Sequence, residues 1–194
     1  MFLDLNTKRK LKGDHNVLNI MAVINCCKIH GVDEDVVREG IASFTGLEHR
    51  IEDVGEFSGI RFYNDSIATV PEATIAALDS LGDKVETVLL GGTDRGLDFS
   101  GLAKRVVGSS VKTIVLFPPS GERIWRAMRE AAKSGAPLPI HFFASSMDEA
   151  VALAKRNTAK NHICLLSPAS PSFGMFRDYK ERGEAFKRLI RDGV

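Results

Sequence analysis

The segment FYNDSIATVPEAT, residues 62–74, joins the end of a predicted strand to the start of a predicted helix. An apolar run from Ile60 to Tyr63 stops at Asn64 and Asp65, and Pro71 stands where a first helical residue would be. Backbone N–H groups at such a helix start are unpaired and partly positive, so an anionic ligand group can bind there. The Asp65 carboxylate could accept ribose hydroxyls or a metal-bound water. The alternative is a capped turn in which Asn64 and Asp65 bond their own backbone.

Helices and strands are predicted to alternate after Pro71. The segments Val88–Leu90, Ile114–Leu116 and Ile163–Leu166 are continuously apolar, as strands covered on both faces must be. This alternation predicts an α/β fold with a mostly parallel, doubly wound (Rossmann-like) sheet and helices on both faces. The predicted helices are 71–81, 99–107, 121–133, 147–157 and 176–191, and the predicted strands are 86–90, 112–117, 140–143 and 162–166.

A short helical region is predicted before the sheet. Apolar residues recur at helical spacing over 14–31 and 33–44, and the pattern changes to period two over 51–56 and 60–63, which predicts a hairpin. We therefore place the boundary between the two parts near Arg50. Residues 1–12 are predicted to form a strand or a ragged start.

Composition favours a small-molecule ligand. The chain has 194 residues, is 44% hydrophobic and 26% charged, and carries a formal charge of +1, so nothing indicates a nucleic-acid or membrane partner. It contains no apolar run long enough for a membrane helix and no signal-peptide core, which predicts a cytoplasmic protein. Cys164 lies in an apolar run and is predicted to be a buried free thiol, and the histidines have no metal-ligand spacing.

Ligands of such sheets bind beyond the carboxyl ends of the strands, where four loops are predicted. In one of them, Gly91 and Gly92 would allow close backbone approach, and Arg95 offers a planar fork for a carboxylate or phosphate. The alternative is a surface arginine on a flexible turn. The four loops are 64–70, 91–98, 117–121 and 167–175.

The loop 167–175 is rich in serine and proline, which predicts either a rigid hydroxyl-lined edge or a turn that caps the last helix. A Ser172 nucleophile is disfavoured because no Gly-x-Ser-x-Gly elbow is present. His49 and Arg50 could form a hinge or a phosphate contact, and a structural histidine is the alternative.

Asn16 and Asn19 lie three residues apart on one face of the first predicted helix. There they could bind the edge of an adenine. A capping or solvated role is the alternative for each.

Together and in this order, these segments resemble the Mur ligases of peptidoglycan synthesis, most closely the members that add glutamate to UDP-N-acetylmuramoyl-L-alanine. The resemblance covers nearly the whole chain, and several spaced motifs in one order are far more specific than any of them alone. The matching motifs are GDHNVLN (13–19), FTGLEHRIE (44–52), NDSIAT (64–69), LGG (90–92), DF (98–99), LLSPA (165–169), SF (172–173) and RGEAF (182–186).

The resemblance implies a three-domain ligase in which ATP phosphorylates a substrate carboxylate and the amine of an amino acid attacks the acyl phosphate. Residues 1–50 would end the central ATPase domain, and residues 51–194 would form the C-terminal amino-acid-binding domain. The implied ATP-binding residues are Asn16, Asn19, Arg50 and Asp65, and the implied glutamate-binding residues are Thr69, Arg95, Ser172, Phe173 and Tyr179.

No phosphate-loop motif G-x-x-x-x-G-K-[ST] is present in the chain. The resemblance places that loop and the Mg²⁺ ligands in the rest of the central domain. We therefore expect no catalytic residue and no metal ligand in these 194 residues, which alone should be inactive. The expected partners are ATP, glutamate, UDP-N-acetylmuramoyl-L-alanine and the remainder of the ligase chain.

Two residues depart from the family pattern. Arg95 stands where the family usually has lysine, and Ile67 replaces the lysine of Asp-Ser-Lys-Ala-Thr. Losing a cation beside a site for a dianion favours a changed substrate, with L-glutamate or another amino acid as the candidates. Two competing hypotheses are a free-standing, non-catalytic module that binds a nucleotide or amino acid, and a folylpolyglutamate-synthase-like domain.

Overall fold

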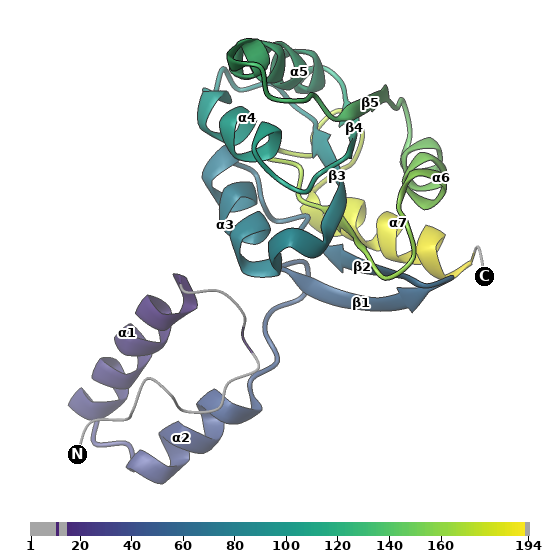
Figure 1. Ribbon diagram of the computed structural model, residues 1–194. Helices are drawn as coiled ribbons and strands as arrows, with labels where there is room; N and C mark the ends of the chain where they lie inside the picture. The colour runs from purple at the N-terminus through teal and green to yellow at the C-terminus, as the bar shows by residue number, and fades with distance from the viewer. Residues whose placement is uncertain (1–10, 12–14, 193–194) are drawn as a thin grey trace.

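A six-stranded sheet, in the order β1-β2-β6-β3-β4-β5, organises the chain (Figure 1). The computed structural model describes residue 11 and residues 15–192, so the predictions for residues 1–10 and 12–14 lie outside it. Neighbouring strands are parallel except β1, which runs antiparallel to β2 at one edge. The predicted mostly parallel sheet is therefore confirmed. The strands are β1 Glu52–Phe57, β2 Ile60–Asn64, β3 Val85–Gly91, β4 Thr113–Phe117, β5 Ile140–Phe143 and β6 Ile163–Leu166.

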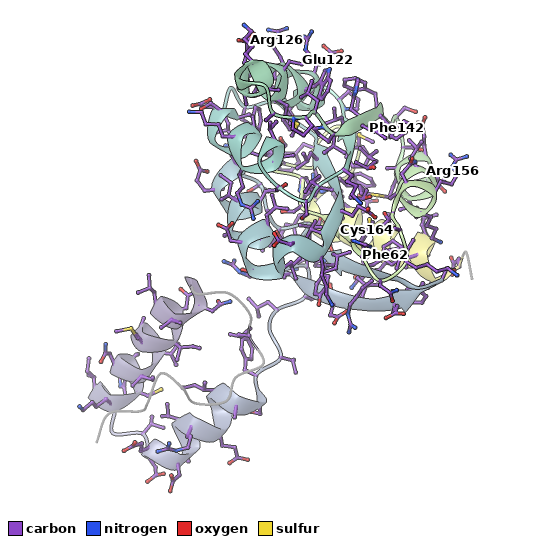
Figure 2. The ribbon with its side chains drawn as sticks, in the orientation of Figure 1. Phe62, Glu122, Arg126, Phe142, Arg156 and Cys164 are labelled. Atoms are coloured by element: carbon purple, nitrogen blue, oxygen red, sulfur yellow. The ribbon has the colours of Figure 1, made fainter. Side chains whose placement is uncertain are left out.

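Helices cover both faces of this sheet, as predicted (Figure 1). One apolar core joins α3, α4 and α5 to strand residues such as Leu90 and Leu116. A second core joins α6 and α7 to the opposite strand face, where Figure 2 labels Phe62 and Cys164. Cys164 is a buried free thiol, as expected. The helices are α3 Pro71–Leu81, α4 Ser100–Val107, α5 Ser120–Ala131, α6 Met147–Asn157 and α7 Tyr179–Arg191.

Among the helices that cover the sheet, the predicted bounds of the last helix and of α5 differ most from the structure. The last helix begins at Tyr179 rather than at 176, because the side chain of Asp178 caps it by accepting the Glu181 N–H at 2.9 Å. Helix α5 starts one residue early, at Ser120, and ends at Ala131, where a 3₁₀ turn replaces the last predicted α-helical residues.

A pair of helices, α1 His15–Ile29 and α2 Glu34–Ser43, precedes the sheet and lies beside it (Figure 1). Asp33 caps α2 by accepting the Asp35 N–H at 2.9 Å. Large apolar side chains remain exposed on both helices; Ile29, for example, is 82% accessible. Within the described part of the chain, no helix is long and apolar enough to cross a membrane.

Candidate functional site

The predicted loops meet at the carboxyl edge of the parallel strands, and backbone hydrogen bonds join them. The Gly91 N–H donates to the Pro168 carbonyl at 2.7 Å, and the Ser120 N–H donates to the Gly92 carbonyl at 3.1 Å. A Cβ on Gly91 would lie 2.3 Å from the carbonyl oxygen of Phe117, so only glycine allows this approach. The loops 91–98, 117–121 and 167–175 therefore form a closely packed edge, which together with the end of β2 is called the platform below.

Asp65 lies in this platform at the end of β2, only 4% exposed. Its Oδ2 accepts the Ser167 hydroxyl at 2.7 Å, and its Oδ1 accepts the Ile51 N–H at 3.2 Å. Burial raises the pKa of Asp65 to about 6, although these two hydrogen bonds and the Arg50 charge oppose the rise. The capped-turn alternative is wrong for Asp65 but holds for Asn64, whose Oδ1 accepts the Ser66 N–H.

His49 is buried between β2 and α7. Its Nδ1 lies 2.9 Å from the Asn64 amide nitrogen, which also donates to Glu52 at 2.8 Å. The His49 and Tyr179 rings form a T-shaped pair with their centroids 5.8 Å apart. This packing favours the structural alternative for His49, whereas the neighbouring Arg50 is exposed and can meet a ligand.

Lys187 of α7 is a buried cation beside this segment. Its ammonium lies 2.7 Å from Glu48, 3.1 Å from Glu52 and 2.8 Å from Glu184. Burial alone would lower the pKa of Lys187, but the hydrogen bonds to these three carboxylates raise it above its usual value.

One group of described residues, Glu48, His49 and Glu184, could supply three metal ligands. The Lys187 ammonium already binds two of these carboxylates, so an internal cation balances their charge. The group therefore does not fit the Mg²⁺ that the resemblance implies, because Mg²⁺ prefers oxygen ligands in octahedral geometry.

The buried side chain of Arg182 connects loop 64–70 to loop 167–175. Its motif alone did not indicate this role. Its guanidinium donates to the Ser66 hydroxyl at 3.0 Å and to the Ser66 and Ser170 carbonyls at 2.8 and 3.0 Å. The Ser66 hydroxyl in turn donates to the carbonyl of Tyr179. Burial lowers the pKa of Arg182 to about 10, which leaves it charged at neutral pH.

The structure brings the loops of Arg95 and Phe173 together. The Thr93 hydroxyl donates to the Phe173 carbonyl at 2.6 Å, and the Thr93 N–H donates to the Pro171 carbonyl at 2.9 Å. The side chains of Arg95 and Phe173 are exposed at this edge, whereas Ser172 is buried. Thr69 and Tyr179 are half-buried.

Asn16, Asn19 and Arg50 line one cavity of about 1030 Å³ between the helical pair and the β1–β2 hairpin. The Asn19 amide donates to Asn16 Oδ1 at 3.2 Å, which confirms that both lie on one helix face. Most other lining residues are apolar. Asp65 does not line this cavity, but its hydrogen-bond partner Ile51 does.

Comparison with known proteins finds similar sequences and similar folds. The domain family "Mur ligase, glutamate ligase domain" matches residues 49–170. The UDP-N-acetylmuramoylalanine–D-glutamate ligase of Symbiobacterium thermophilum is 40% identical over 98% of this chain and 40% of its own length. The UDP-N-acetylmuramoyl-L-alanine–L-glutamate ligase of Salinispora tropica is 36% identical over 94% of the chain and 40% of its own length. The chain therefore spans about 40% of these curated relatives.

Solved structures share the fold. UDP-N-acetylmuramate-alanine ligase MurC of Thermotoga maritima superposes with a TM-score of 0.68 at 20% identity, over 96% of this chain and 40% of that one. Folylpolyglutamate synthase of Mycobacterium tuberculosis, complexed with ADP, gives 0.63 at 18% identity, over 92% and 41%. The fold is thus common to Mur ligases and folylpolyglutamate synthase. The chain is 40% identical to the Symbiobacterium ligase but only 18% identical to the folylpolyglutamate synthase.

Proposed function

Because this chain belongs to the Mur ligase family, we propose that it is the C-terminal part of an ATP-dependent ligase that adds glutamate to UDP-N-acetylmuramoyl-L-alanine. The observation that carries the proposal is the 40% identity to a glutamate ligase over 98% of the chain. The Symbiobacterium and Salinispora relatives are named as ligases that join glutamate to UDP-N-acetylmuramoylalanine, which supports this substrate pair. The expected cytoplasmic location belongs to the same proposal.

We assign residues 1–50 to the end of the central ATPase domain and residues 51–194 to the amino-acid-binding domain. The exposed apolar residues of α1 and α2 support this division, because large side chains such as Ile29 would be covered by the rest of a larger domain. The family match begins at residue 49, close to the proposed boundary.

The nucleotide side of the proposed site combines amide, guanidinium and carboxylate groups. Asn16 and Asn19 offer amide donors and acceptors to adenine, and Arg50 offers a charged fork to phosphate oxygens. Asp65, which the resemblance assigns to ribose hydroxyls, is only 4% exposed and is linked to this cavity through its hydrogen bond to the Ile51 N–H. The phosphate loop and the Mg²⁺ ligands belong to the part of the ligase outside this chain, and Mg²⁺ would offset charge on the transferred phosphoryl group.

The amino-acid side lies at the platform edge. We assign a carboxylate of glutamate to Arg95, whose fork can form two parallel hydrogen bonds. Thr69, Ser172 and Tyr179 would contribute polar groups, and Phe173 an apolar wall.

The reaction balances without a redox partner. The terminal phosphoryl group of ATP passes to the carboxylate of UDP-N-acetylmuramoyl-L-alanine, releasing ADP. The glutamate amine attacks this acyl phosphate, the C–N bond forms, and phosphate leaves while the amine loses a proton. The residues of this chain bind and orient the nucleotide and the amine in this scheme.

An assay of the complete ligase tests the proposal. With UDP-N-acetylmuramoyl-L-alanine, ATP, Mg²⁺ and glutamate, the product mass should rise by one glutamyl residue, with one phosphate released per product. The 194-residue chain alone should form no product. Failure of the complete protein to join any glutamate isomer, together with tight binding of a nucleotide or amino acid, would favour the non-catalytic module instead.

A further inference from the structure

We propose that Arg123 of α5 is a positioning residue that holds the Arg95 loop in the conformation that binds the incoming amino acid. The inference rests on the proposed function, in which Arg95 binds a carboxylate of that amino acid. Arg123 itself would not touch the substrate.

Two contacts of Arg123 bracket Arg95 in the loop. Its Nη1 lies 2.5 Å from Asp94 Oδ1, and its Nη2 donates to the Leu97 carbonyl at 2.8 Å. One guanidinium therefore fixes the residue before Arg95 and the residue two positions after it. A guanidinium can do both because its donors form a rigid, planar fork.

Further contacts tie this bracket to the folded core. Asp94 Oδ1 also accepts the Gly96 N–H at 2.9 Å, so both neighbours of Arg95 are held. The Arg123 guanidinium lies over the ring of Phe99, 5.4 Å from its centroid, and Phe99, the residue before α4, is buried in the core. The Gly96 N–H lowers the pKa of Asp94, and Arg123 acts in the same direction, so the carboxylate stays ionised.

Arg95 needs such support because its own side chain is exposed and its loop follows a strand end. A binding arginine on an unheld loop must lose backbone and side-chain freedom when the ligand arrives, which weakens binding. Holding positions 94, 96 and 97 in advance removes part of that loss. On the other side, Thr93 is held by the Phe173 carbonyl, so the loop is fixed at both ends.

The test is steady-state kinetics of the complete ligase. Arg123→Ala should raise the KM for glutamate by about tenfold, corresponding to roughly 1.4 kcal/mol, and leave the KM for ATP within about twofold. Arg123→Lys should restore only part of the affinity for glutamate, because a lysine ammonium can pair with the Asp94 carboxylate but cannot also donate to the Leu97 carbonyl. Arg126→Ala is the matched control, since Arg126 lies exposed on the outer side of the same helix (Figure 2) and should change neither KM.

A double variant separates the inference from the proposed function. If Arg123 acts through Arg95, adding Arg123→Ala to Arg95→Ala should raise the glutamate KM by less than about twofold further. A normal glutamate KM in Arg95→Ala would refute the assigned role of Arg95 and the inference with it. A raised KM in Arg95→Ala, beside a normal KM in Arg123→Ala, would refute the inference alone.

Hydrogen exchange gives a readout that does not depend on activity. In Arg123→Ala, the Gly96 amide should exchange faster, while amides of β3 and β4 should keep their rates. Faster exchange throughout the sheet would mean that Arg123 stabilises the whole fold, and would overturn the positioning role.

Discussion

Oδ1 of Asp65 accepts the backbone N–H of Ile51 at 3.2 Å, which ties the end of β2 to the segment between the helical pair and the sheet. Ile51 and His49 both have left-handed backbone conformations, with φ of 46° and 63°. A β-branched residue rarely adopts that conformation, so surrounding contacts must hold it. Asp65 is one of these contacts, and it is also a proposed ribose ligand. A bound nucleotide would therefore lie against the segment that links the helical pair to the sheet.

The first prediction concerns the pH dependence of stability. Because burial raises the pKa of Asp65 from 3.8 to about 6, the folded state holds this proton more tightly than the unfolded state. The contribution of Asp65 to folding is therefore fully present below pH about 4 and is lost as the pH rises to about 6, a change of about 3 kcal/mol.

Asp65→Asn removes this titration and keeps the shape of the side chain. The free energy of unfolding of the variant, relative to the wild type, should increase between pH about 4 and about 7. Urea unfolding of both proteins across this range measures the difference, in which the other carboxylates cancel. A constant difference across the range would mean that Asp65 titrates normally.

The second prediction concerns Gly183 in α7. A Cβ at this position would lie 2.3 Å from His49 Nδ1 and 3.0 Å from the Asn64 amide nitrogen. Gly183→Ala should therefore lower the free energy of unfolding by about 1–3 kcal/mol through overpacking, despite the better helix propensity of alanine.

Gly101→Ala in α4 is the matched control. Its Cβ would lie 3.8 Å from the Ile75 side chain, an ordinary van der Waals separation. This variant should be neutral or up to about 1 kcal/mol more stable. If the two alanine variants unfold at the same denaturant concentration, the close packing of α7 on His49 is wrong.

The third prediction concerns Lys187, whose side chain is only 4% exposed among three glutamates. Lys187→Met keeps most of the apolar stem but leaves the carboxylates without their cation. Glu48 and Glu184 can regain water, whereas Glu52 is 23% exposed and cannot do so fully. We expect a loss of about 1–3 kcal/mol in thermal or urea unfolding.

The neighbouring Arg188 is exposed on the same helix, and Arg188→Met should stay within about 0.5 kcal/mol of the wild type. Equal stability of the two methionine variants would show that the carboxylates near Lys187 do not depend on it.

Local patterns predicted the sheet because its strands are apolar on both faces and Pro71 marks a helix start. They placed the start of the last helix wrongly because Phe176 continues the apolar spacing, whereas the cap formed by Asp178 decides the boundary. Burial of Arg182 and Lys187 could not be predicted, since charged residues on an amphipathic helix usually face water. Several of their partners are distant in the sequence and meet them only after folding: Ser66 lies 116 residues from Arg182, and Glu52 lies 135 residues from Lys187.

The residues of the candidate site were proposed from the resemblance, whereas the hydrogen bonds and ion pairs that connect them could not be predicted from it. The likeness of Asn16, Asn19 and Arg50 to family positions indicated a shared site, and the structure shows that the three line one cavity. The Arg123 bracket carries no motif, because it depends on packing between α5 and a loop from another part of the chain.

Ile67 is the remaining departure from the family pattern, and the structure places it half-buried in the turn after β2. Its N–H donates to the His49 carbonyl at 3.2 Å, which holds its backbone against the segment between the helical pair and the sheet. An apolar side chain here supplies no charge to a dicarboxylate, which must then rely on Arg95, hydroxyls and the helix start at Pro71. This different arrangement of charge favours a changed stereochemical preference.

The last prediction is that the complete ligase prefers L-glutamate to D-glutamate. A competition assay with UDP-N-acetylmuramoyl-L-alanine, ATP and both enantiomers, one of them isotopically labelled, measures the ratio of kcat/KM values by product mass. Ile67→Lys should move this ratio toward D-glutamate, whereas Ile67→Leu, which keeps the apolar character, should leave it unchanged. A wild-type preference for D-glutamate of more than about tenfold, roughly 1.4 kcal/mol, would show that Ile67 is a tolerated substitution in a D-glutamate ligase.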